Sequence, residues 1–332
     1  MANIFDNKTI LITGGTGSFG RSFTEFLLNN FKPKKLIIFS RDEYKQFKMQ
    51  QEIKDPNLRL RFFLGDVRDP DRLKRAFDGV NLVIHAAALK QVPTLEYNPT
   101  EAIKTNILGS HNVIEAAIDQ GISKVLFISS DKAVQPINLY GATKLCAEKL
   151  FVAANSYSPN KTLFSIVRYG NVVNSRGSII ETLLSGKEAP SIVKITDPNM
   201  TRFWLTLEQS FNLVSFAIQN MKGGEIFVPK IPSMRLGDLF DVIAPASKKE
   251  IIGIRPGEKI HEVLLTENES RKSVLVGQYF VILPEISSRP EVYEKYYKMG
   301  KKLKNKFRFA SDTNTARLTK KNFKNKIKIQ LL

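Results

Sequence analysis

The sequence is poor in the residues that form disulfides and metal sites. It has one cysteine and three histidines among 332 residues. Cys146 has no partner for an internal disulfide, which favours a reducing compartment, and its place in a helical pattern predicts a packing residue. His85, His111 and His261 stand far apart without the spacing of metal ligands, so we expect no structural metal.

Long apolar runs are also missing. No stretch of about 18 apolar residues occurs, so we expect no membrane span. The segment Met1–Lys8 is polar and has no basic part followed by an apolar one, so we expect no secretory signal. Together these absences favour a cytoplasmic protein.

Acidic residues are scarce relative to basic ones: 32 Asp and Glu stand against 50 Lys and Arg, a net charge of +18. Such an excess of positive charge can bind a nucleic acid or an anionic membrane. The positive charge is spread along the chain, however, and is densest between Lys301 and Lys328. No aromatic–basic RNA motif or DNA-reading helix pattern accompanies it. We therefore expect neither of those partners and favour a solvated basic surface that helps to attract an anionic substrate.

The first half of the chain alternates short apolar runs with segments of helical spacing. The expected strands are Thr9–Thr13, Lys35–Phe39, Arg61–Leu64, Leu82–His85, Lys124–Ser129 and Leu163–Tyr169, and the clearest helices are Phe19–Asn29, Thr100–Gln120 and Tyr140–Ala154. Strands that alternate with helices build a parallel sheet with helices on both faces. The fold class is therefore α/β, a Rossmann-type doubly wound parallel sheet, which binds ligands at the carboxyl ends of its strands.

The alternation breaks down after about Asn171, where proline and glycine become frequent. Short strand-like pieces, Glu225–Val228 and Ile251–Ile254, appear between helical patterns. We therefore divide the chain into a dinucleotide-binding domain, 1–170, and a smaller α+β substrate-binding lobe, 171–332, some segments of which return to the core. The part beyond about Pro284 is a polar, basic tail.

A glycine-rich turn gives the strongest local signal. The strand Thr9–Thr13 is followed by a turn whose expected cofactor-binding residues are Gly14, Thr16, Gly17, Ser18, Phe19 and Gly20. Glycines let the backbone N–H groups approach a pyrophosphate, and the N-terminus of the following helix favours an anion. Because this turn lies between a strand and a helix, it predicts a dinucleotide site.

The end of the second strand predicts which dinucleotide is bound. NAD-selective sites usually have an acidic residue at this tip, whereas this chain has Ser40 followed by Arg41. A guanidinium beside the ribose suits a 2′-phosphate, so NADP is favoured over NAD. Asp42 could still serve the ribose, but it is better suited to cap the next helix.

Two more strand ends contribute to the same site. Asp66 and Val67 follow the third strand, where an acidic side chain can bond the adenine amino group. Ala86, Ala87 and Ala88 follow the fourth, and their small side chains let the dinucleotide lie against the backbone.

A candidate catalytic set follows the fifth strand. Tyr140 and Lys144 are four residues apart and share one face of a helix, where an ammonium lowers the pKa of a phenol. Ser129 supplies a hydroxyl at the strand end, and Asp131 and Lys132 supply a charged pair in the next loop.

These motifs resemble the extended short-chain dehydrogenase/reductase family. Five segments narrow the resemblance to its inverting UDP-N-acetylglucosamine 4,6-dehydratases, which begin pseudaminic-acid synthesis: 129–133, 138–144, 168–172, 200–204 and 253–259. The likeness runs from about Lys8 to Glu262. Related enzymes with an Asp-Lys-Ala loop often have Met at the position of Tyr140, so Tyr140 favours the inverting group.

The resemblance implies an NADP-dependent dehydration of a UDP-sugar by a homo-oligomer. It implies that Tyr140 takes the C4 hydroxyl proton, with Lys144 lowering its pKa, and that Ser129 bonds the C4 oxygen. Lys132, as a neutral amine, removes the C5 proton, and Asp131 protonates the departing C6 hydroxyl. Hydride then returns to C6, and a proton delivered to the opposite face inverts C5.

The same resemblance implies where the sugar nucleotide binds. The expected substrate-binding residues are Lys90, Ser129, Asn171, Arg176, Gly177, Ser178 and Arg255. Arg176 and Arg255 suit the diphosphate, because guanidinium groups match phosphate oxygens. The chain departs from the pattern at Gln91, Asn174 and 180–183, near the expected sugar pocket, which leaves the identity of the sugar open.

Two alternatives remain at this point. A nucleotide-sugar epimerase of the same family would use Tyr140, Lys144 and the cofactor without losing water. A non-catalytic NADP-sensing or RNA-binding protein on the same fold is favoured only by the basic tail, and the complete Ser–Tyr–Lys set argues against it.

Overall fold

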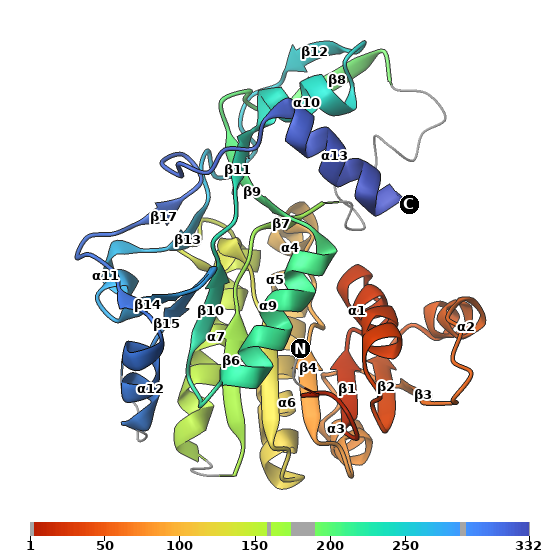
Figure 1. Ribbon diagram of the computed structural model, residues 1–332. Coiled ribbons are helices and arrows are strands. Elements are labelled where there is room, and N and C mark those ends of the chain that lie inside the picture. The colour runs from red at the N-terminus through yellow and green to blue at the C-terminus, as the bar shows by residue number, and fades with distance from the viewer. Residues whose placement is uncertain (1–2, 158–160, 174–189, 286–289, 332) are drawn as a thin grey trace.

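A ten-stranded sheet forms the centre of the protein (Figure 1). The computed structural model describes residues 3–157, 161–173, 190–285 and 290–331. Within these ranges the strand order is β16-β14-β15-β10-β6-β5-β4-β1-β2-β3. All pairs from β3 to β10 are parallel, and β15, β14 and β16 add an antiparallel edge. The order 3-2-1-4-5-6 is that of a doubly wound dinucleotide-binding sheet, as the alternating pattern predicted.

The first six strands are close to their expected positions. They are β1 (Thr9–Thr13), β2 (Lys35–Ser40), β3 (Leu60–Leu64), β4 (Leu82–His85), β5 (Lys124–Ile128) and β6 (Leu163–Val167). The later strands of the sheet are β10 (Ile226–Pro229), β14 (Ser273–Val276), β15 (Tyr279–Ile282) and β16 (Lys301–Lys302). Segments beyond residue 171 thus complete the central sheet.

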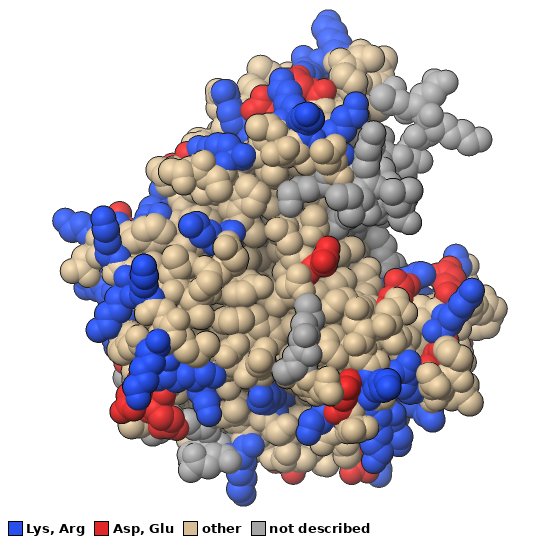
Figure 2. Space-filling view, viewed as in Figure 1, with Lys and Arg blue, Asp and Glu red and all other residues tan. Residues whose placement is uncertain are grey.

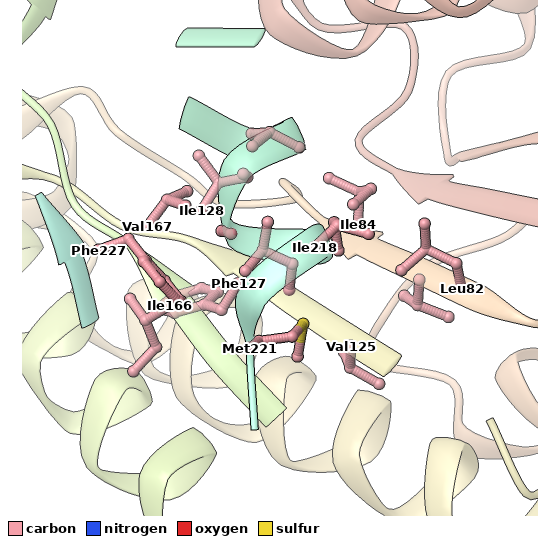
Figure 3. Close-up of a cluster of buried hydrophobic side chains, with 14 of the residues drawn as sticks. Leu82, Ile84, Val125, Phe127, Ile128, Ile166, Val167, Ile218, Met221 and Phe227 are labelled. Atoms are coloured by element: carbon pink, nitrogen blue, oxygen red, sulfur yellow. The ribbon is translucent and has the colours of Figure 1, made fainter. Parts of the chain in front are cut away.

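Helices cover both faces of this sheet. One face carries α1 (Ser18–Asn30) and α9 (Leu207–Asn220), which contact each other, and the other carries α3 (Pro70–Phe77), α6 (Gly109–Asp119) and α7 (Leu139–Tyr157). Figure 3 shows Ile218 and Met221 at the end of α9 packed among the side chains of β4, β5 and β6. Three further helices lie between these elements: α2 (Glu43–Glu52), α4 (Val92–Tyr97) and α5 (Pro99–Ala102).

The helix expected over Thr100–Gln120 is not uniform. Between α5 and α6, residues Ile103–Leu108 form a π-helical segment. The wider turn buries Thr105 and Asn106 and leaves Ile103 exposed. The buried Asn106 side chain donates to the Leu89 carbonyl oxygen at 3.0 Å and accepts from the Leu89 amide at 2.8 Å, which accounts for the changed register.

Cys146 corrects a second expectation. It lies on an exposed face of α7 and is not a packing residue. The helix is buried instead through residues such as Ala147, Phe151 and Ala154.

A second lobe lies above the carboxyl ends of the sheet (Figure 1). Its strands are β7 (Asn171–Val172), β8 (Ile192–Ile195), β9 (Thr201–Leu205), β11 (Ser233–Arg235), β12 (Lys248–Ile251), β13 (Val263–Leu265) and β17 (Phe309–Ala310). Its helices are α10 (Leu236–Ile243) and α13 (Lys320–Leu331), which pack on each other. Two further helices, α11 (Glu267–Ser270) and α12 (Glu291–Met299), contact strand β14 at the antiparallel edge of the central sheet.

The basic tail is largely part of this folded structure, since it supplies β16, β17, α12 and α13. The strand expected at Ile251–Ile254 is wrong. The chain instead pairs over Lys248–Ile251, and a left-handed Gly253, with φ of 81°, follows its end. Met200 and Trp204 are core residues of this lobe.

A buried ion-pair network joins the lobe to the sheet. Arg168, just after β6, donates to both carboxylate oxygens of Glu148 on α7, at 3.0 and 2.6 Å. It also bonds Glu269 of α11 at 2.9 Å and the carbonyl oxygen of Leu264 in β13 at 3.1 Å. Arg168 and Glu148 are each 2% exposed, so the loss of either would leave an uncompensated buried charge.

Arg168→Met should therefore lower the free energy of unfolding by about 3–5 kcal/mol. The matched control is Arg75→Met on the exposed side of α3, which should change it by no more than about 0.5 kcal/mol. Urea titration followed by circular dichroism measures both. Equal effects of the two substitutions would contradict a structural role for the network.

Candidate active site

A cleft of about 840 Å³ lies at the carboxyl ends of the parallel strands. It opens between β1 and β4, where the strand order reverses and doubly wound sheets bind ligands. All the expected cofactor-binding residues line it: Gly14, Thr16, Gly17, Ser18, Phe19, Gly20, Ser40, Arg41, Asp66, Val67, Ala86, Ala87, Ala88, Tyr140 and Lys144. The structure thus brings together residues from four strand ends and from helix α7 (Leu139–Tyr157).

The glycine turn closely approaches the loop after β4. Gly14 has φ of 63°, and a Cβ atom there would lie 2.9 Å from the Cα and amide nitrogen of Ala87. The turn leads into the N-terminus of α1, whose N-cap residue, Gly17, makes no side-chain capping bond. Backbone N–H groups at such a helix end favour an anion, so the geometry fits a dinucleotide pyrophosphate.

Two buried side chains that the sequence did not single out hold the alanine loop in place. The Thr13 hydroxyl oxygen accepts from the amides of Ala86 and Ala87, both at 3.2 Å. Asn106 fixes Leu89 through both of its backbone groups, and its amide nitrogen also donates to the Thr143 hydroxyl at 3.0 Å. Neither residue lies in a recognisable motif, because each is far in the sequence from the loop that it holds.

His85 is buried and neutral beneath this loop. Because Thr13 accepts from two amides, its own proton goes to Nδ1 of His85, 2.7 Å away. Nε2 then carries the ring proton toward the Ser110 hydroxyl at 3.1 Å, and Ser110 donates to the Asn106 carbonyl oxygen. Burial, helped by the charge of Lys144, lowers the pKa of His85 to about 3, in keeping with this assignment.

The adenosine end of the cleft has charge of both signs. Arg41 lies 3.8 Å from Asp66, and Asp66 accepts closer bonds from Arg68 at 2.7 and 3.0 Å. Burial opposes ionisation of Asp66, but its bonds to Arg68 outweigh this and lower its pKa. Asp42 accepts from the Lys45 amide and caps α2, as expected.

The Tyr140–Lys144 pair occupies the first turns of α7, and the close packing of Gly141 on the carbonyl oxygen of Lys132 fixes its depth in the cleft. Lys144 donates to the Ile128 carbonyl oxygen at 2.6 Å and lies over the Phe127 ring, and burial lowers its pKa to about 7 against the effect of Glu148. Burial raises the pKa of Tyr140, and the cation that opposes this is Lys132. The Lys144 ammonium bonds a backbone carbonyl oxygen, and its expected effect on the pKa of Tyr140 stays a prediction.

Ser130, and not Ser129, is the serine hydroxyl that lies beside Tyr140. Ser129 is buried, and its hydroxyl donates to Glu148 at 2.6 Å, so it belongs to the Arg168 network. The Ser130 hydroxyl instead interacts with Tyr140 and donates to Asp131 at 2.9 Å. Ser130, which also lines the cleft, is thus the better candidate to bond a substrate oxygen.

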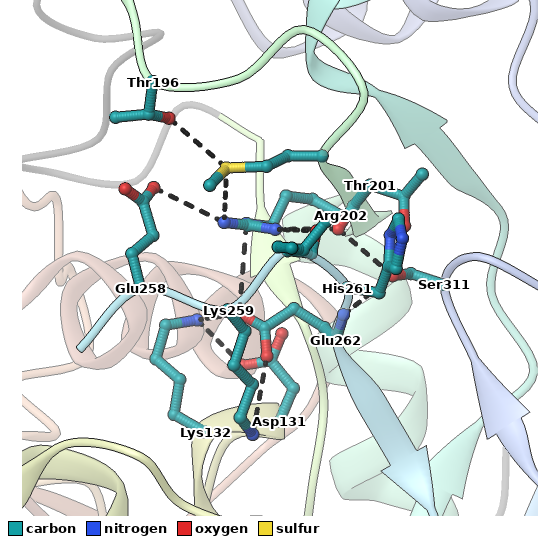
Figure 4. Close-up of polar contacts among 12 residues, drawn as sticks. Asp131, Lys132, Thr196, Thr201, Arg202, Glu258, Lys259, His261, Glu262 and Ser311 are labelled. Atoms are coloured by element: carbon teal, nitrogen blue, oxygen red, sulfur yellow. Dashed lines mark hydrogen bonds and ion pairs between the residues drawn. The ribbon is translucent and has the colours of Figure 1, made fainter. Parts of the chain in front are cut away.

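The Asp131–Lys132 pair sits between the cleft and a group of buried charges (Figure 4). Lys132 Nζ lies 3.0 Å from Asp131 Oδ1 and 3.6 Å from Glu262 Oε1. Burial alone would lower the pKa of Lys132, but the two carboxylates outweigh it and raise the pKa. The neutral amine that the expected mechanism needs is therefore not the state of Lys132 in the protein without substrate. Lys132 lines the cleft, whereas Asp131 is fully buried behind it.

The expected substrate residues are only partly assembled. Lys90 and Asn171 line the cleft, together with Gln91 and Tyr169. Arg255 is exposed on the loop after β12 and does not line the cleft. Arg176, Gly177 and Ser178 lie outside the described residues. His261 bonds the Thr201 hydroxyl at 2.9 Å, in keeping with a structural role.

Basic side chains do not gather in one stripe on the face shown in Figure 2, where they are scattered around the edge with acidic ones among them. Across the described part of the chain, no His, Cys, Asp and Glu cluster has three members placed to hold a metal ion. In the same residues, no helix is both long and apolar enough to cross a membrane.

The doubly wound sheet, the glycine turn at its switch point and the Tyr140–Lys144 pair define a Rossmann-type dinucleotide-binding protein of the extended short-chain dehydrogenase/reductase class. The chain belongs to the family described as polysaccharide biosynthesis proteins, whose pattern matches residues 10–284.

Named relatives agree with the resemblance that the motifs predicted. A protein of Campylobacter jejuni subsp. jejuni serotype O:2, named UDP-N-acetylglucosamine 4,6-dehydratase (inverting), is 49% identical, and the match covers 94% of each chain. A Rickettsia conorii protein named UDP-glucose 4-epimerase is 43% identical over 90% of this chain and 89% of its own. The X-ray structure of Pen from Bacillus thuringiensis is 39% identical, with a TM-score of 0.89, and covers 98% of this chain and 99% of that one.

The close approach at Gly14 can be tested with Gly14→Ala. The added methyl group meets the Ala87 backbone, so we expect binding of NADPH to weaken roughly tenfold or more, a change of about 1.4 kcal/mol or above. Gly79→Ala is the matched control, because Gly79 has a similar φ of 67° but nothing within 4 Å of its added Cβ. Fluorescence titration with NADPH gives the affinities. The assignment of the turn is overturned if both variants bind NADPH as the unchanged protein does.

Proposed function

We propose that the protein catalyses NADP-dependent 4,6-dehydration of UDP-N-acetylglucosamine with inversion at C5. The product is UDP-2-acetamido-2,6-dideoxy-β-L-arabino-hex-4-ulose, and the reaction is the first step of pseudaminic-acid-type sugar biosynthesis. The observation that carries the proposal is the Asp131–Lys132 pair beside Tyr140, with a Nζ–Oδ1 distance of 3.0 Å. An acid and a base joined in this way suit an elimination, which an epimerase does not need.

Oxidation at C4 makes the elimination possible. A bound nicotinamide would supply the acceptor for the C4 hydride and later return that hydride to C6. Tyr140 takes the C4 hydroxyl proton, and the phenol so formed holds the C4 oxygen. Lys144, whose pKa is lowered to about 7, lines the cleft and bonds the cofactor ribose. The resulting C4 ketone acidifies the C5 proton, which prepares the loss of water.

The resting ion pair carries the proton that the elimination needs. Moving one proton from Lys132 Nζ to Asp131 Oδ1 leaves an amine and a carboxylic acid. The amine removes the C5 proton, while the acid supplies the proton with which the C6 hydroxyl leaves as water. Because Asp131 is buried and Ser130 Oγ lies 2.9 Å from Oδ1, Ser130 passes that proton to the C6 oxygen. The pair ends as the ion pair with which it began. The return of the hydride to C6 would be matched by a solvent proton that reaches C5 on the face opposite Lys132, and Tyr140 releases to solvent the proton that it took from the C4 hydroxyl.

Two features support the finer parts of the proposal. Ser40 and Arg41 at the end of β2, with Asp42 engaged as a helix cap, favour a 2′-phosphate and hence NADP over NAD. Tyr97, Ile103 and Leu108 are exposed around α4 and the π-helical segment, which supports the homo-oligomer. The cytoplasm is the proposed location, and a UDP-sugar the proposed partner.

Selectivity for NADP predicts the effect of Arg41→Ala. Loss of a charge-assisted bond of about 1.5–3 kcal/mol should raise the Kd of NADPH by roughly one to two orders of magnitude. Binding of NADH, which has no 2′-phosphate, should change little and serves as the internal control. Titration of both cofactors measures this. Equal weakening of NADPH and NADH would mean that Arg41 does not read the 2′-phosphate.

The reaction itself is tested by incubation with UDP-N-acetylglucosamine in D₂O and mass spectrometry. We expect a product lighter by one water, with deuterium at C5. Lys132→Met, which keeps the length but not the amine, should slow its formation by about 10²–10⁴-fold. A product of unchanged mass would support the epimerase alternative, which the Rickettsia relatives favour, and would contradict dehydration.

A further inference from the structure

Glu262 is a buried carboxylate that the proposed reaction does not yet use. It lies immediately before β13, is 3% exposed and does not line the cleft. Its backbone is fixed by two bonds to Ser311, from the Glu262 amide to the Ser311 hydroxyl and from the Ser311 amide to the Glu262 carbonyl oxygen, each at 2.8 Å. The side chain is thereby held at one depth behind the Asp131–Lys132 pair.

Three cations converge on this one carboxylate (Figure 4). Glu262 Oε1 lies 3.6 Å from Lys132 Nζ and 3.9 Å from Arg202 Nε, and Oε2 lies 3.9 Å from Lys259 Nζ. Oε2 is buried and has no hydrogen-bond partner among the described residues. A carboxylate that is surrounded by cations but not saturated by hydrogen bonds acts mainly through its charge.

Lys132 is the cation of this group that lines the cleft. The charged and titratable groups that face it come from three places: Asp131 and Tyr140 from the loop and helix on its own side, Arg202 from β9, and Glu262 and Lys259 from the segment before β13. Burial and Arg202 lower the pKa of Lys132, whereas Asp131 and Glu262 raise it. Asp131 is the partner in the proton transfer, so Glu262 is the fixed negative charge of the site.

We propose that Glu262 is a positioning residue that keeps Lys132 protonated and directed at Asp131, and that it thereby sets the pH range in which the acid–base pair works. The catalytic role of Glu262 rests on the proposed dehydration, but its effect on the protonation of Lys132 does not. Without Glu262, Lys132 would lose its proton to solvent at lower pH, and the pair would then lack the proton that the leaving hydroxyl requires.

Glu262→Gln tests this, because it keeps the shape and removes the charge. A carboxylate within about 4–6 Å typically shifts a neighbouring pKa by roughly 1–3 units, so the Lys132 titration midpoint should fall by at least about one unit. Competitive acetylation with acetic anhydride across pH, read by peptide mass spectrometry, measures that midpoint without any need for turnover. An unchanged midpoint overturns the proposal.

Glu258→Gln is the matched control. Glu258 belongs to the same segment and pairs with Arg202 at 3.4 Å, but it has no direct pair with Lys132. Its loss should leave the Lys132 midpoint close to that of the unchanged protein. Should Glu262→Gln fail to fold, Glu262→Asp keeps the charge but withdraws it by one methylene, and a smaller shift in the same direction is expected. No shift in a folded Glu262→Asp variant would then count against the proposal.

The pH profile of turnover gives the second readout. For Glu262→Gln, the alkaline limb of kcat should move to lower pH while KM for the UDP-sugar stays the same, since Glu262 does not touch the cleft. A merely structural role would lower kcat equally at every pH and leave the limb in place, which overturns the proposal. If the unchanged protein forms no dehydrated product, the proposed function fails, while the acetylation result still decides the role of Glu262.

Discussion

The bidentate bond between Arg168 and Glu148 is the contact on which the arrangement of the site depends. Glu148 lies one turn beyond Lys144 on α7. Arg168, which bonds Glu148, also donates to Leu264 of β13 and to Glu269 of α11. A buried pair of this kind tolerates little displacement, because separating the two partners would leave two unpaired charges in a low-dielectric interior. The catalytic helix, the end of β6 and the segment that carries Glu262 therefore keep one relative position. Glu148 also engages the Ser129 hydroxyl, which leaves Ser130 as the hydroxyl beside Tyr140.

Much of the fold and the cofactor cleft could be predicted because their signals are local. The strand before Gly14, the positive φ of that glycine and the helix after it are encoded within about a dozen consecutive residues. The spacing of Tyr140 and Lys144 likewise needs only a helix, and the structure supplies one. The order of the parallel strands follows from the alternation of strands and helices, since right-handed crossovers leave few other topologies.

The errors arose where a side chain depends on a distant partner. Two adjacent serines offer two hydroxyls, and the choice between them is made by Glu148, 19 residues beyond Ser129. The charge of Lys132 depends on Glu262, which no local pattern connects to it. The register of the π-helical segment depends on the bonds that Asn106 makes to Leu89, 17 residues earlier. Helical spacing could place Ile103 and Cys146 on a helix but could not say which face the rest of the protein would cover.

The charges behind Lys132 also explain why an acid–base pair suits this position. Lys132, Lys259 and Arg202 carry three positive charges, and Asp131, Glu262 and Glu258 carry three negative ones, so the ionised group is neutral as a whole. Release of the Lys132 proton to solvent would leave a net negative charge in a largely buried region, which is costly. Transfer of the same proton to Asp131 leaves the total charge unchanged. The surroundings therefore favour a proton that moves within the pair over one that exchanges with water. The proposed reaction needs this property, because it ends with the pair in the state in which it began.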